Sequence, residues 1–468
     1  MIRHMLASLA CLSLAAPAIA EDYPPAPPMG SLKPFTLHAT ETFTLPNGMK
    51  ITLIPFGSVP QATISLNVFA GRLDAAGRPW LAELTGDMLK EGAGARSSAQ
   101  IADAAAAMGG NVSVGTGTIN TALNLTVLSE HASDAIALLA DLARAPTFPA
   151  SEFGRAKDNR VRSLSLALSQ AQPVAELALG HAYYGDHPYG ATYPTSAQLG
   201  GYTLADVRAF HAANFGAQRA HLYIAGRFDT AAVRAAVSKA FGGWAKGPAR
   251  LSLPPTPKPG PQFILVDRPG APQSTIRLAF PGAAIGSTGD FPLRVMDTLL
   301  SGSFNSRITR NIRENKGYTY SPGSQAAFHP GETVWVFQAD VTSTATGASL
   351  HEIFSEIRTL QATPPGAEET AGMATYRATD PIFNGSTAGG LIGTLAQYEA
   401  LNQPPSYIAN YVPRALAVTP AQISAAARAT LPLERMTLVV VGDLKTVLPQ
   451  LKAQPELAGA NFVTVTLP

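Results

Sequence analysis

Cysteine is almost absent from this chain of 468 residues, in which Cys11 is the single one. It lies in the N-terminal segment MIRHMLASLACLSLAAPAIA, where Arg3 and His4 precede an apolar run that ends in small residues at 18–20. This pattern is typical of an export signal followed by a cleavage site. After its removal no cysteine would remain, which excludes disulfides, a thiol nucleophile and a thiolate zinc site.

The predicted signal covers residues 1–20, and its alanine-rich composition is typical of bacteria. We therefore expect a periplasmic protein. Cys11 leaves a lipid-attached N-terminus as the alternative, but Ser8 is a poor residue three positions before a lipidated cysteine. The apolar run is too short for a permanent anchor, and no later stretch approaches twenty uncharged apolar residues, so we expect no stable membrane span.

Charged residues are also scarce, at 14% of the chain, and the formal net charge is only +2. Without a basic block or basic residues interleaved with aromatics, the sequence does not favour nucleic acid as a partner. A G-x-S-x-G elbow, a Walker loop and a strand followed by G-x-G-x-x-G are missing as well. The nine histidines include no pair at i, i+3 or i, i+4, so no single helix presents two histidine ligands to zinc.

Proline, by contrast, is abundant and marks the expected boundaries, with 38 residues in the chain. A proline-rich leader follows the signal over 21–39. The segment KGPARLSLPPTPKPGPQ over 246–262 holds six prolines and no periodicity, which indicates a linker. We expect one domain over 40–245 and a second over 263–468.

These two halves resemble each other in sequence. TISLNVFAG at 63–71 matches TIRLAFPG at 275–282, and YTLADVRAFHAANF at 202–215 parallels VTPAQISAAARATL at 418–431. The offset stays between about 212 and 216 residues over several elements, which indicates an internal duplication. Period-two strands are expected at 121–129 and 332–341, and alanine-rich helices at 98–109 and 133–145. We predict two α+β repeats, each a mostly antiparallel sheet covered by helices.

Two segments contain residue types that can bind metals or stabilise charge. In PWLAELTGDMLKEG, residues 79–92, Glu83 and Asp87 lie four apart and share one face of a predicted helix. In NIRENKGYTYSPGS, residues 311–324, Gly317 is placed to end a helix in a left-handed conformation, so that Arg313 lies on the last helical turns and Tyr320 on the following strand.

A guanidinium and a phenol in that arrangement could both donate hydrogen bonds to a peptide carbonyl or a developing oxyanion. Taken alone, an arginine near a helix end is more often a solvated cap and a strand tyrosine more often packing. The neighbouring SGSFNS at 301–306 is small and flexible, and we interpret it as a loop rather than a phosphate site.

Four motifs together resemble the insulinase, pitrilysin and mitochondrial processing peptidase family of zinc peptidases. They are LPNGMKITLIP (45–55), YGDHPYG (184–190), VDRPGAPQSTIRL (266–278) and SGSFNSRITRNIRENKGYTYS (301–321). The resemblance covers nearly all of residues 40–445. It implies a processing-peptidase-like half-shell built from two homologous repeats.

Active members of that family carry H-x-x-E-H, an inverted zinc motif, on the first long helix. The motif falls here on residues 83–87, where both histidines are replaced, by Glu83 and Asp87, and the general-base glutamate by Gly86. In the family the third ligand is a glutamate on a later helix, and the corresponding stretch here, residues 159–175, contains no carboxylate. We therefore expect no metal in this chain, and we interpret Glu83 and Asp87 as solvated helix surface, with a residual metal or partner role as the alternative.

The resemblance also implies a role for the second half. Members of the family present an arginine and a tyrosine, seven residues apart, that reach into the zinc cleft and bind substrate, and Arg313 and Tyr320 match that spacing. The chain thus resembles the subunit of a two-chain peptidase that lacks zinc, with a homologous zinc-bearing partner and peptide substrates. The alternatives are a peptide-binding scaffold without a catalytic role, pairing of the chain with itself, or an active peptidase with an unrecognised metal site.

Overall fold

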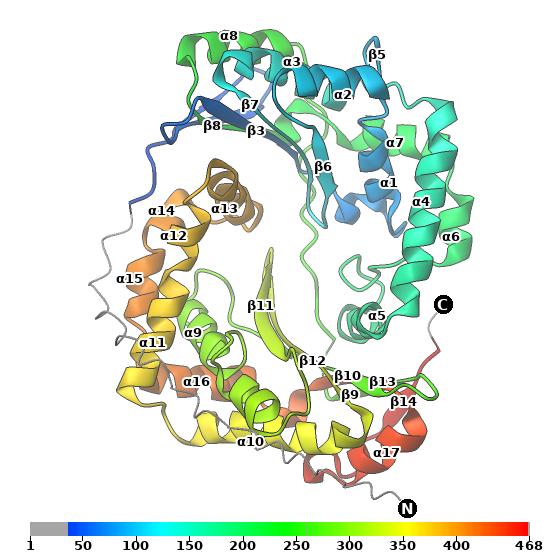
Figure 1. Cartoon of the computed structure of the whole chain (residues 1–468), viewed down its shortest axis with the longest axis vertical. Helices are drawn as coiled ribbons and strands as arrows, with labels where there is room; N and C mark the ends of the chain where they lie inside the picture. Colours follow the sequence, from blue (N-terminus) through cyan, green and yellow to red (C-terminus); the bar gives the residue numbers. More distant parts are fainter. Residues whose placement is uncertain (1–35, 259, 467–468) are drawn as a thin grey trace, which may run out of the picture. The chain divides into compact units, whose positions relative to one another are not determined.

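Two six-stranded sheets covered by helices make up the computed structural model, which describes residues 36–258 and 260–466 (Figure 1). The predicted signal at 1–20, Cys11 within it, and the leader up to residue 35 lie outside the described residues. No helix in the described ranges is both long enough and apolar enough to cross a membrane.

The first sheet has the strand order β1-β2-β8-β3-β7-β6. Its strands are β1 (Glu41–Thr44), β2 (Lys50–Pro55), β3 (Gln61–Val68), β6 (Ser113–Thr116), β7 (Thr121–Leu128) and β8 (Ala220–Gly226), and a separate hairpin joins β4 (Gly92–Ala93) to β5 (Arg96–Ser97). The helices of this half are α1 (Leu81–Met88), α2 (Ser98–Ala107), α3 (Ala132–Arg144), α4 (Ala150–Ser169), α5 (Ala171–Tyr184), α6 (Ser196–Gly201), α7 (Leu204–Asn214) and α8 (Thr230–Phe241).

The second sheet has the order β11-β12-β10-β13-β9-β14. Its strands are β9 (Gln262–Asp267), β10 (Gln273–Pro281), β11 (Gly323–His329), β12 (Glu332–Thr342), β13 (Thr437–Gly442) and β14 (Phe462–Thr464). The helices are α9 (Asp290–Leu300), α10 (Thr346–Ala362), α11 (Ala367–Ala378), α12 (Asp380–Asn384), α13 (Ala388–Ala400), α14 (Pro405–Ala409), α15 (Tyr411–Leu416), α16 (Pro420–Thr430) and α17 (Leu444–Lys452), with a π-helical segment at Thr309–Asn315.

The two sheets share one topology. From β2 to β6 and from β9 to β11, each pair of neighbouring strands has the same relative direction: parallel once and then antiparallel three times. Only the outermost strand differs, because β1 pairs antiparallel with β2 whereas β14 pairs parallel with β9. The predicted α+β class and the mostly antiparallel sheets are confirmed, and the matching topology agrees with a duplication.

Local sequence explains the positions of several elements. The alternation in TALNLTVL places every second side chain of β7 in the core, as expected for a strand with one buried face. Thr203 and Thr419, the residues before α7 and α16, each accept a hydrogen bond from the backbone of the third helical residue, so the two repeats cap the equivalent helix in the same way.

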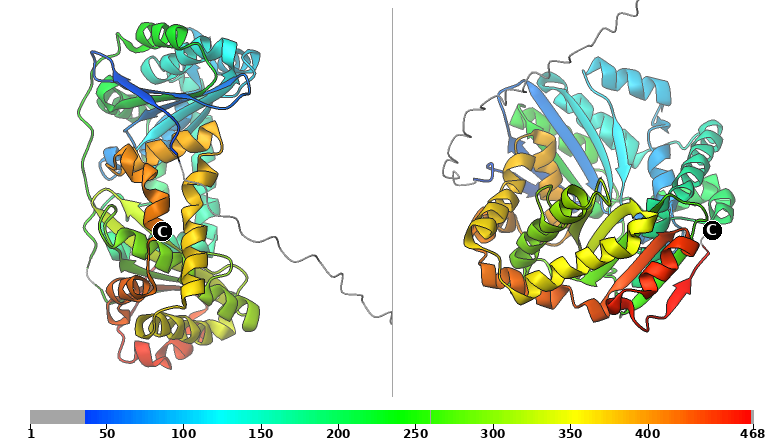
Figure 2. Two further views of the ribbon diagram at one scale, coloured as in Figure 1. Left: turned by 90° about the vertical axis from the view of Figure 1, so that its left-hand side faces the viewer. Right: turned by 60° about the horizontal axis from the view of Figure 1, so that its bottom comes forward.

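One helix of each half packs on the sheet of the other half (Figure 1). α5 lies on β13, β10 and β9, where Val174 and Ala178 join a core with Val439 and Val441. α13, the matching helix of the second half, lies on β8 and β3. The intervening residues 245–258 have no regular secondary structure and run as an extended segment (Figure 2). Through this exchange of helices, the described residues from 36 to 466 form one compact unit.

Candidate functional site

The positions of the zinc motif lie on α1, which is buried along nearly its whole length. Glu83 is only 5% exposed, and one of its oxygens, Oε1, accepts a hydrogen bond from Nε of Arg72 at 3.0 Å and lies 3.0 Å from Nη2 of the same guanidinium, within ion-pair distance. The other oxygen is buried and has no hydrogen-bond partner among the described residues. Arg72 belongs to the 3₁₀ turn Arg72–Ala75, so this ion pair ties α1 to the segment that precedes it.

Asp87, one turn further along α1, pairs with α4 instead. Arg160 donates two hydrogen bonds to the Asp87 carboxylate, from Nε to Oδ2 at 2.6 Å and from Nη2 to Oδ1 at 2.8 Å. A fork of this kind is the strongest geometry for an arginine and a carboxylate. The same guanidinium lies over the ring of Trp80, so the pair is held on two sides.

Our interpretation of Glu83 and Asp87 as solvated helix surface is therefore wrong for Glu83 and incomplete for Asp87. The sequence around α1 hides this, because the arginines that pair with the two carboxylates come from 11 residues before Glu83 and 73 residues after Asp87. A charge can be buried when an opposite charge is buried beside it, and both partners here are guanidinium groups.

These residues do not fit a zinc ion. Each of the two carboxylates already faces a guanidinium, and no cluster of three histidine, cysteine or acidic side chains capable of holding a metal occurs in the part of the chain that the structure describes. A catalytic zinc site takes three protein ligands and one open position. Instead of a metal ion, the positively charged side chain of Arg160 connects α4 to Asp87 on α1.

Gly86 lies where α1 and β6 approach each other closely. A Cβ at this position would come to 2.3 Å from Oγ1 of Thr116 on β6, much closer than side chains tolerate. β6 therefore approaches α1 at the point where the family has its general-base glutamate. A glutamate at position 86 would require Thr116 to move.

Replacing Gly86 by alanine is expected to lower the free energy of unfolding by about 1–2 kcal/mol, because the added methyl overpacks the contact with Thr116. Urea denaturation followed by circular dichroism measures the change. The control is Gly372→Ala in α11, where the new Cβ meets nothing within 4 Å among the described residues. That change should stabilise the protein by about 0.5 kcal/mol, since alanine restricts the unfolded chain. Equal effects of the two changes would contradict the steric argument.

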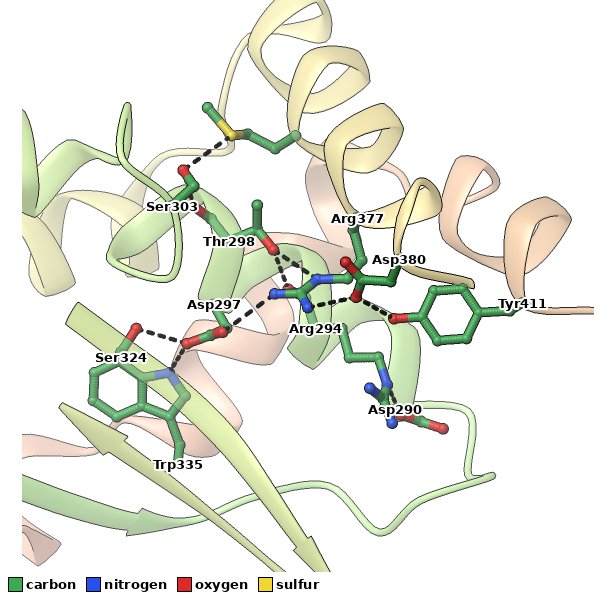
Figure 3. A network of polar contacts seen from close by, with 11 residues as sticks. Asp290, Arg294, Asp297, Thr298, Ser303, Ser324, Trp335, Arg377, Asp380 and Tyr411 are labelled. Carbon is green, nitrogen blue, oxygen red and sulfur yellow. Dashed lines mark hydrogen bonds and ion pairs between the residues drawn. The ribbon is translucent and has the colours of Figure 1, made fainter. Parts of the chain in front are cut away.

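The second half repeats the arginine pair at the equivalent place (Figure 3). The sequence DMLKEG that begins at Asp87 aligns with DTLLSG that begins at Asp297 on α9. Arg160 and Arg377 are each the eleventh residue of α4 and α11. Nη2 of Arg377 lies 3.5 Å from the Asp297 carboxylate. Both repeats thus join the corresponding helices with a carboxylate and an arginine.

Asp297 is almost completely buried, and the protein supplies it with several donors (Figure 3). The indole Nε1 of Trp335 donates to Oδ1 at 2.7 Å, and the hydroxyl of Ser324 donates to the same oxygen at 2.6 Å. Burial raises the pKa of Asp297, and Arg377 together with these donors opposes that rise. The network fixes α9 against the sheet and against α11, which makes it a structural element of this half.

Arg313 lies in the π-helical segment Thr309–Asn315, an unusual conformation that is frequent at functional sites. Gly317 ends this segment with φ at +64°, as predicted. The amide of Tyr318 donates to the carbonyl of Ile312, and the amide of Gly317 donates to that of Arg313, so the last carbonyls have partners.

The structure brings Arg313 and Tyr320 together. The guanidinium carbon of Arg313 is 5.0 Å from the centre of the Tyr320 ring. It also lies 4.3 Å from the centre of the Phe304 ring. Both rings are solvent-exposed, at 78% for Tyr320 and 64% for Phe304, which is unusual for large aromatic groups. We call Phe304, Arg313 and Tyr320 the cation–aromatic cluster.

Two details of this cluster differ from the sequence interpretation. Tyr320 precedes the strand instead of lying on it, because Pro322 lacks an amide donor and β11 begins only at Gly323. Residues 301–306 form a loop as expected, but the loop also delivers Phe304 to the guanidinium. A large aromatic residue in an otherwise small and polar loop was the signal that could have revealed it.

The cluster presents hydrogen-bond donors to solvent. Nε of Arg313 lies 3.0 Å from the carboxylate of Glu314, whereas its two Nη groups and the hydroxyl of Tyr320 have no hydrogen-bond partner within the described ranges. Contacts with ring faces restrict a guanidinium and leave its edge available. The arrangement can therefore bind a carbonyl or an anion through several N–H and O–H groups at once.

The motif YGDHPYG lies where the two halves of the chain meet. Tyr183 and Tyr184 at the end of α5 both donate to the carboxylate of Glu332, at 3.4 and 3.1 Å, and Glu332 begins β12. The ring of Tyr189 lies 4.1 Å from that of His329 across the same junction. Burial raises the pKa of Glu332 to about 7, although the two phenols favour its ionised form.

Glu332 is expected to make the stability of the junction depend on pH. Its pKa is higher in the folded chain, at about 7, than in the unfolded chain, so the folded state binds more protons between pH 5 and 7. Its contribution to the free energy of unfolding is therefore fully present near pH 4 and is lost as the pH rises through 7. The difference in stability between wild type and Glu332→Gln should decrease from pH 5 to 8.

Urea denaturation at several pH values measures this difference, and the exposed Glu130→Gln is the matched change of carboxylate to amide. The stability of wild type alone would not isolate the effect of Glu332. Burial lowers the pKa of His329 to about 4, and a lowered histidine pKa makes the protein less stable as the pH falls, opposite to the effect of Glu332. A difference that grows with pH would contradict the assignment.

Comparison with known proteins connects both halves to one family. The family described as "Insulinase (Peptidase family M16)" matches residues 57–194, and "Peptidase M16 inactive domain" matches residues 201–374. An uncharacterised zinc protease of Mycobacterium bovis is 26% identical over 378 residues, which are 79% of this chain and 82% of that protein. Another, of Bacillus subtilis, is 26% identical over 287 residues, 60% of this chain and 68% of that protein.

Solved structures show the same fold. A peptidase M16 inactive domain from Pseudomonas fluorescens superposes with a TM-score of 0.78 at 23% identity, over 86% of this chain and 98% of that one. A protease from Helicobacter pylori gives a TM-score of 0.79 at 15% identity, over 87% of this chain and all of that one (100%). At these identities the superpositions establish the architecture alone.

Proposed function

This chain belongs to the M16 (insulinase) family of zinc-protease homologues, and from that premise we propose that it is the non-catalytic subunit of a two-chain peptidase. The observation that carries the proposal is a contrast between its two repeats. Arginines occupy the place of a metal on α1, while the second repeat exposes the cation–aromatic cluster with free donors. The chain retains groups that bind substrate and lacks the ligands for a metal.

In this proposal Arg313 and Tyr320 contact the substrate. The Nη groups of Arg313 and the hydroxyl of Tyr320 donate to a peptide carbonyl or to the oxyanion that forms from it. Such donors are among the largest single contributions to catalysis. The substrate is an extended peptide or an unfolded segment, which would add a strand to a sheet edge and be recognised mainly through its backbone.

The partner is a homologous chain with an intact H-x-x-E-H, and zinc chemistry belongs to that partner. A heterodimer accounts for the missing zinc ligands of this chain, because the partner supplies them. A homodimer of this chain would contain no zinc motif. We further propose that the protein is exported through residues 1–20 to the periplasm, and that 40–245 and 263–468 are two domains joined by the linker 246–262.

Reconstitution tests the proposal. The purified chain is mixed with a candidate partner that carries H-x-x-E-H, and cleavage of a quenched fluorescent peptide is followed. Activity should appear only in the mixture, and a complex should elute with both chains on gel filtration. Zinc in stoichiometric amount in this chain alone, together with activity of this chain alone, would refute the assignment.

A peptide-binding scaffold is the second candidate. Because Glu83 and Asp87 on α1 do not fit a zinc ion, that observation supports the scaffold as well as it supports the non-catalytic subunit. The two candidates differ in what the cation–aromatic cluster does. If the complex forms and cleaves peptides but activity does not depend on Arg313 or Tyr320, the scaffold is the better assignment.

A further inference from the structure

A cavity of about 350 Å³ lies between α5 and the face of the second sheet formed by β10, β12 and β11. Its volume is at the lower end of the range for small-ligand sites, roughly 300–1,000 Å³, and suits a single side chain or chain end. The polar groups around it belong to both halves of the chain. They include Arg72, Glu176, Tyr189, Thr192, Arg277 and Gln338.

Arg277 is the central feature of this cavity. One of its Nη groups donates to the side-chain carbonyl of Gln172 at 3.0 Å, while its Nε is buried and has no partner among the described residues. No carboxylate of the described chain lies at ion-pair distance from it, in contrast to Arg72, which pairs with Glu83. Burial lowers the pKa of Arg277, but an arginine stays charged in proteins.

Two further donors of the cavity are also unpaired. The hydroxyls of Tyr189 and Thr192 are buried and have no hydrogen-bond partner in residues 36–258 and 260–466. Burial raises the pKa of Tyr189, so its phenol keeps its proton and can donate. Buried polar groups are nearly always paired, so three such groups around one cavity need an explanation.

The acidic groups near Arg277 do not supply that explanation. Glu176 lines the cavity and Asp340 lies on β12, and both favour the charged form of Arg277. Glu176 is exposed to solvent and makes no ion pair with Arg277 within the described ranges. Asp340 is occupied by the hydroxyl of Thr275. The cavity therefore combines an arginine without an ion-pair partner and two hydroxyl donors, a set that calls for a ligand rich in acceptors.

The cavity also lies close to the edge of the sheet. Arg277 pairs in register with Gln338 on β12, and Gln338 pairs with Gly323, the first residue of the edge strand β11. Tyr320 of the cation–aromatic cluster is three residues before that strand. A peptide that runs along β11 from the cluster would therefore pass within side-chain reach of the cavity.

We propose that this cavity binds a carboxylate of the bound peptide, with Arg277 as its ion-pair partner and the hydroxyls of Tyr189 and Thr192 as further donors. The carboxylate belongs to an acidic side chain or to the C-terminus of the peptide. This inference rests on the proposed function, since it assumes that the chain binds extended peptides. It assigns a preference for acidic or C-terminal segments to the subunit that lacks zinc.

Three fluorescein-labelled peptides of ten residues test the inference, by fluorescence anisotropy with the isolated chain. They share one neutral sequence and carry either a central glutamate with an amidated C-terminus, a central glutamine with an amidated C-terminus, or a central glutamine with a free C-terminus. At least one carboxylate peptide should bind roughly tenfold or more tightly than the neutral one, as expected for a charge-assisted pair. Which one does so identifies the source of the carboxylate.

Arg277→Gln should abolish that preference, and Tyr189→Phe should reduce it. Arg435→Gln, which removes an exposed charge elsewhere, should leave it unchanged, and thermal unfolding checks that each variant is folded. Equal binding of the three peptides, no measurable binding of any, or a preference that survives Arg277→Gln would each overturn the inference. Because the measurement needs no partner, loss of partner-dependent cleavage would count against the proposed function alone.

Discussion

Arg313→Ala is expected to lower kcat/KM for peptide cleavage by the reconstituted complex roughly 10²–10³-fold. The guanidinium contacts two aromatic rings, and its Nη groups have no hydrogen-bond partner among the described residues, so the contacts restrict the donors before the oxyanion forms. Removing a donor that acts mainly in the transition state lowers kcat more than it raises KM. Tyr320→Phe removes the second donor and should give a smaller loss of the same kind.

The controls for this prediction come from the same segment. Arg310→Ala removes an exposed arginine three residues away and should leave the rate within about twofold of wild type, since it lies outside the cluster. Phe304→Ala keeps both donors but releases one face of the guanidinium, so its effect should be intermediate. If Arg310→Ala reduced cleavage as strongly as Arg313→Ala, general charge would explain the effect better than the geometry of the cluster.

Asp297→Ala is expected to lower the free energy of unfolding by about 3 kcal/mol, the largest stability change that we predict. The carboxylate is buried, and its loss would leave the indole N–H of Trp335 and the hydroxyl of Ser324 without an acceptor. Arg377 would keep Asp380 at 2.9 Å, which limits the cost. Urea denaturation measures the change, and Asp297→Asn, which keeps one acceptor oxygen, should cost less.

The duplication supplies the control for this second prediction. Asp87→Ala removes the equivalent carboxylate from the first repeat, where the side chains of Arg160 and Asp87 are 25% and 37% exposed to solvent. Exposed pairs contribute about 0–1 kcal/mol, so the loss should be about 1 kcal/mol or less. Similar losses at the two positions would mean that burial does not set the value of these pairs.

Much of the fold could be predicted from the sequence because its signals are local. The alternation of β7, the threonine caps before α7 and α16, and the left-handed Gly317 each follow from a few consecutive residues. The constant offset between the repeats then extends each assignment to the other half. The spacing between Arg313 and Tyr320 was visible in the same way.

The partners of buried charges could not be predicted, since they depend on contacts between distant segments. Nothing near Glu83 or Asp87 in the sequence indicates the arginines that bind them. The exchange of α5 and α13 between the sheets is equally hidden, because an apolar helix face fits either sheet.

By itself, then, the sequence determined the repeat, its α+β class and the loss of histidine ligands, all of which are properties of residue type and order. Only the tertiary structure decided that arginines neutralise Glu83 and Asp87, that Phe304 completes the cluster around Arg313, and that Arg277 faces a cavity without an ion-pair partner in the described chain. The physical reason is that the energy of a charge depends on what is packed around it, and packing is set by the whole fold.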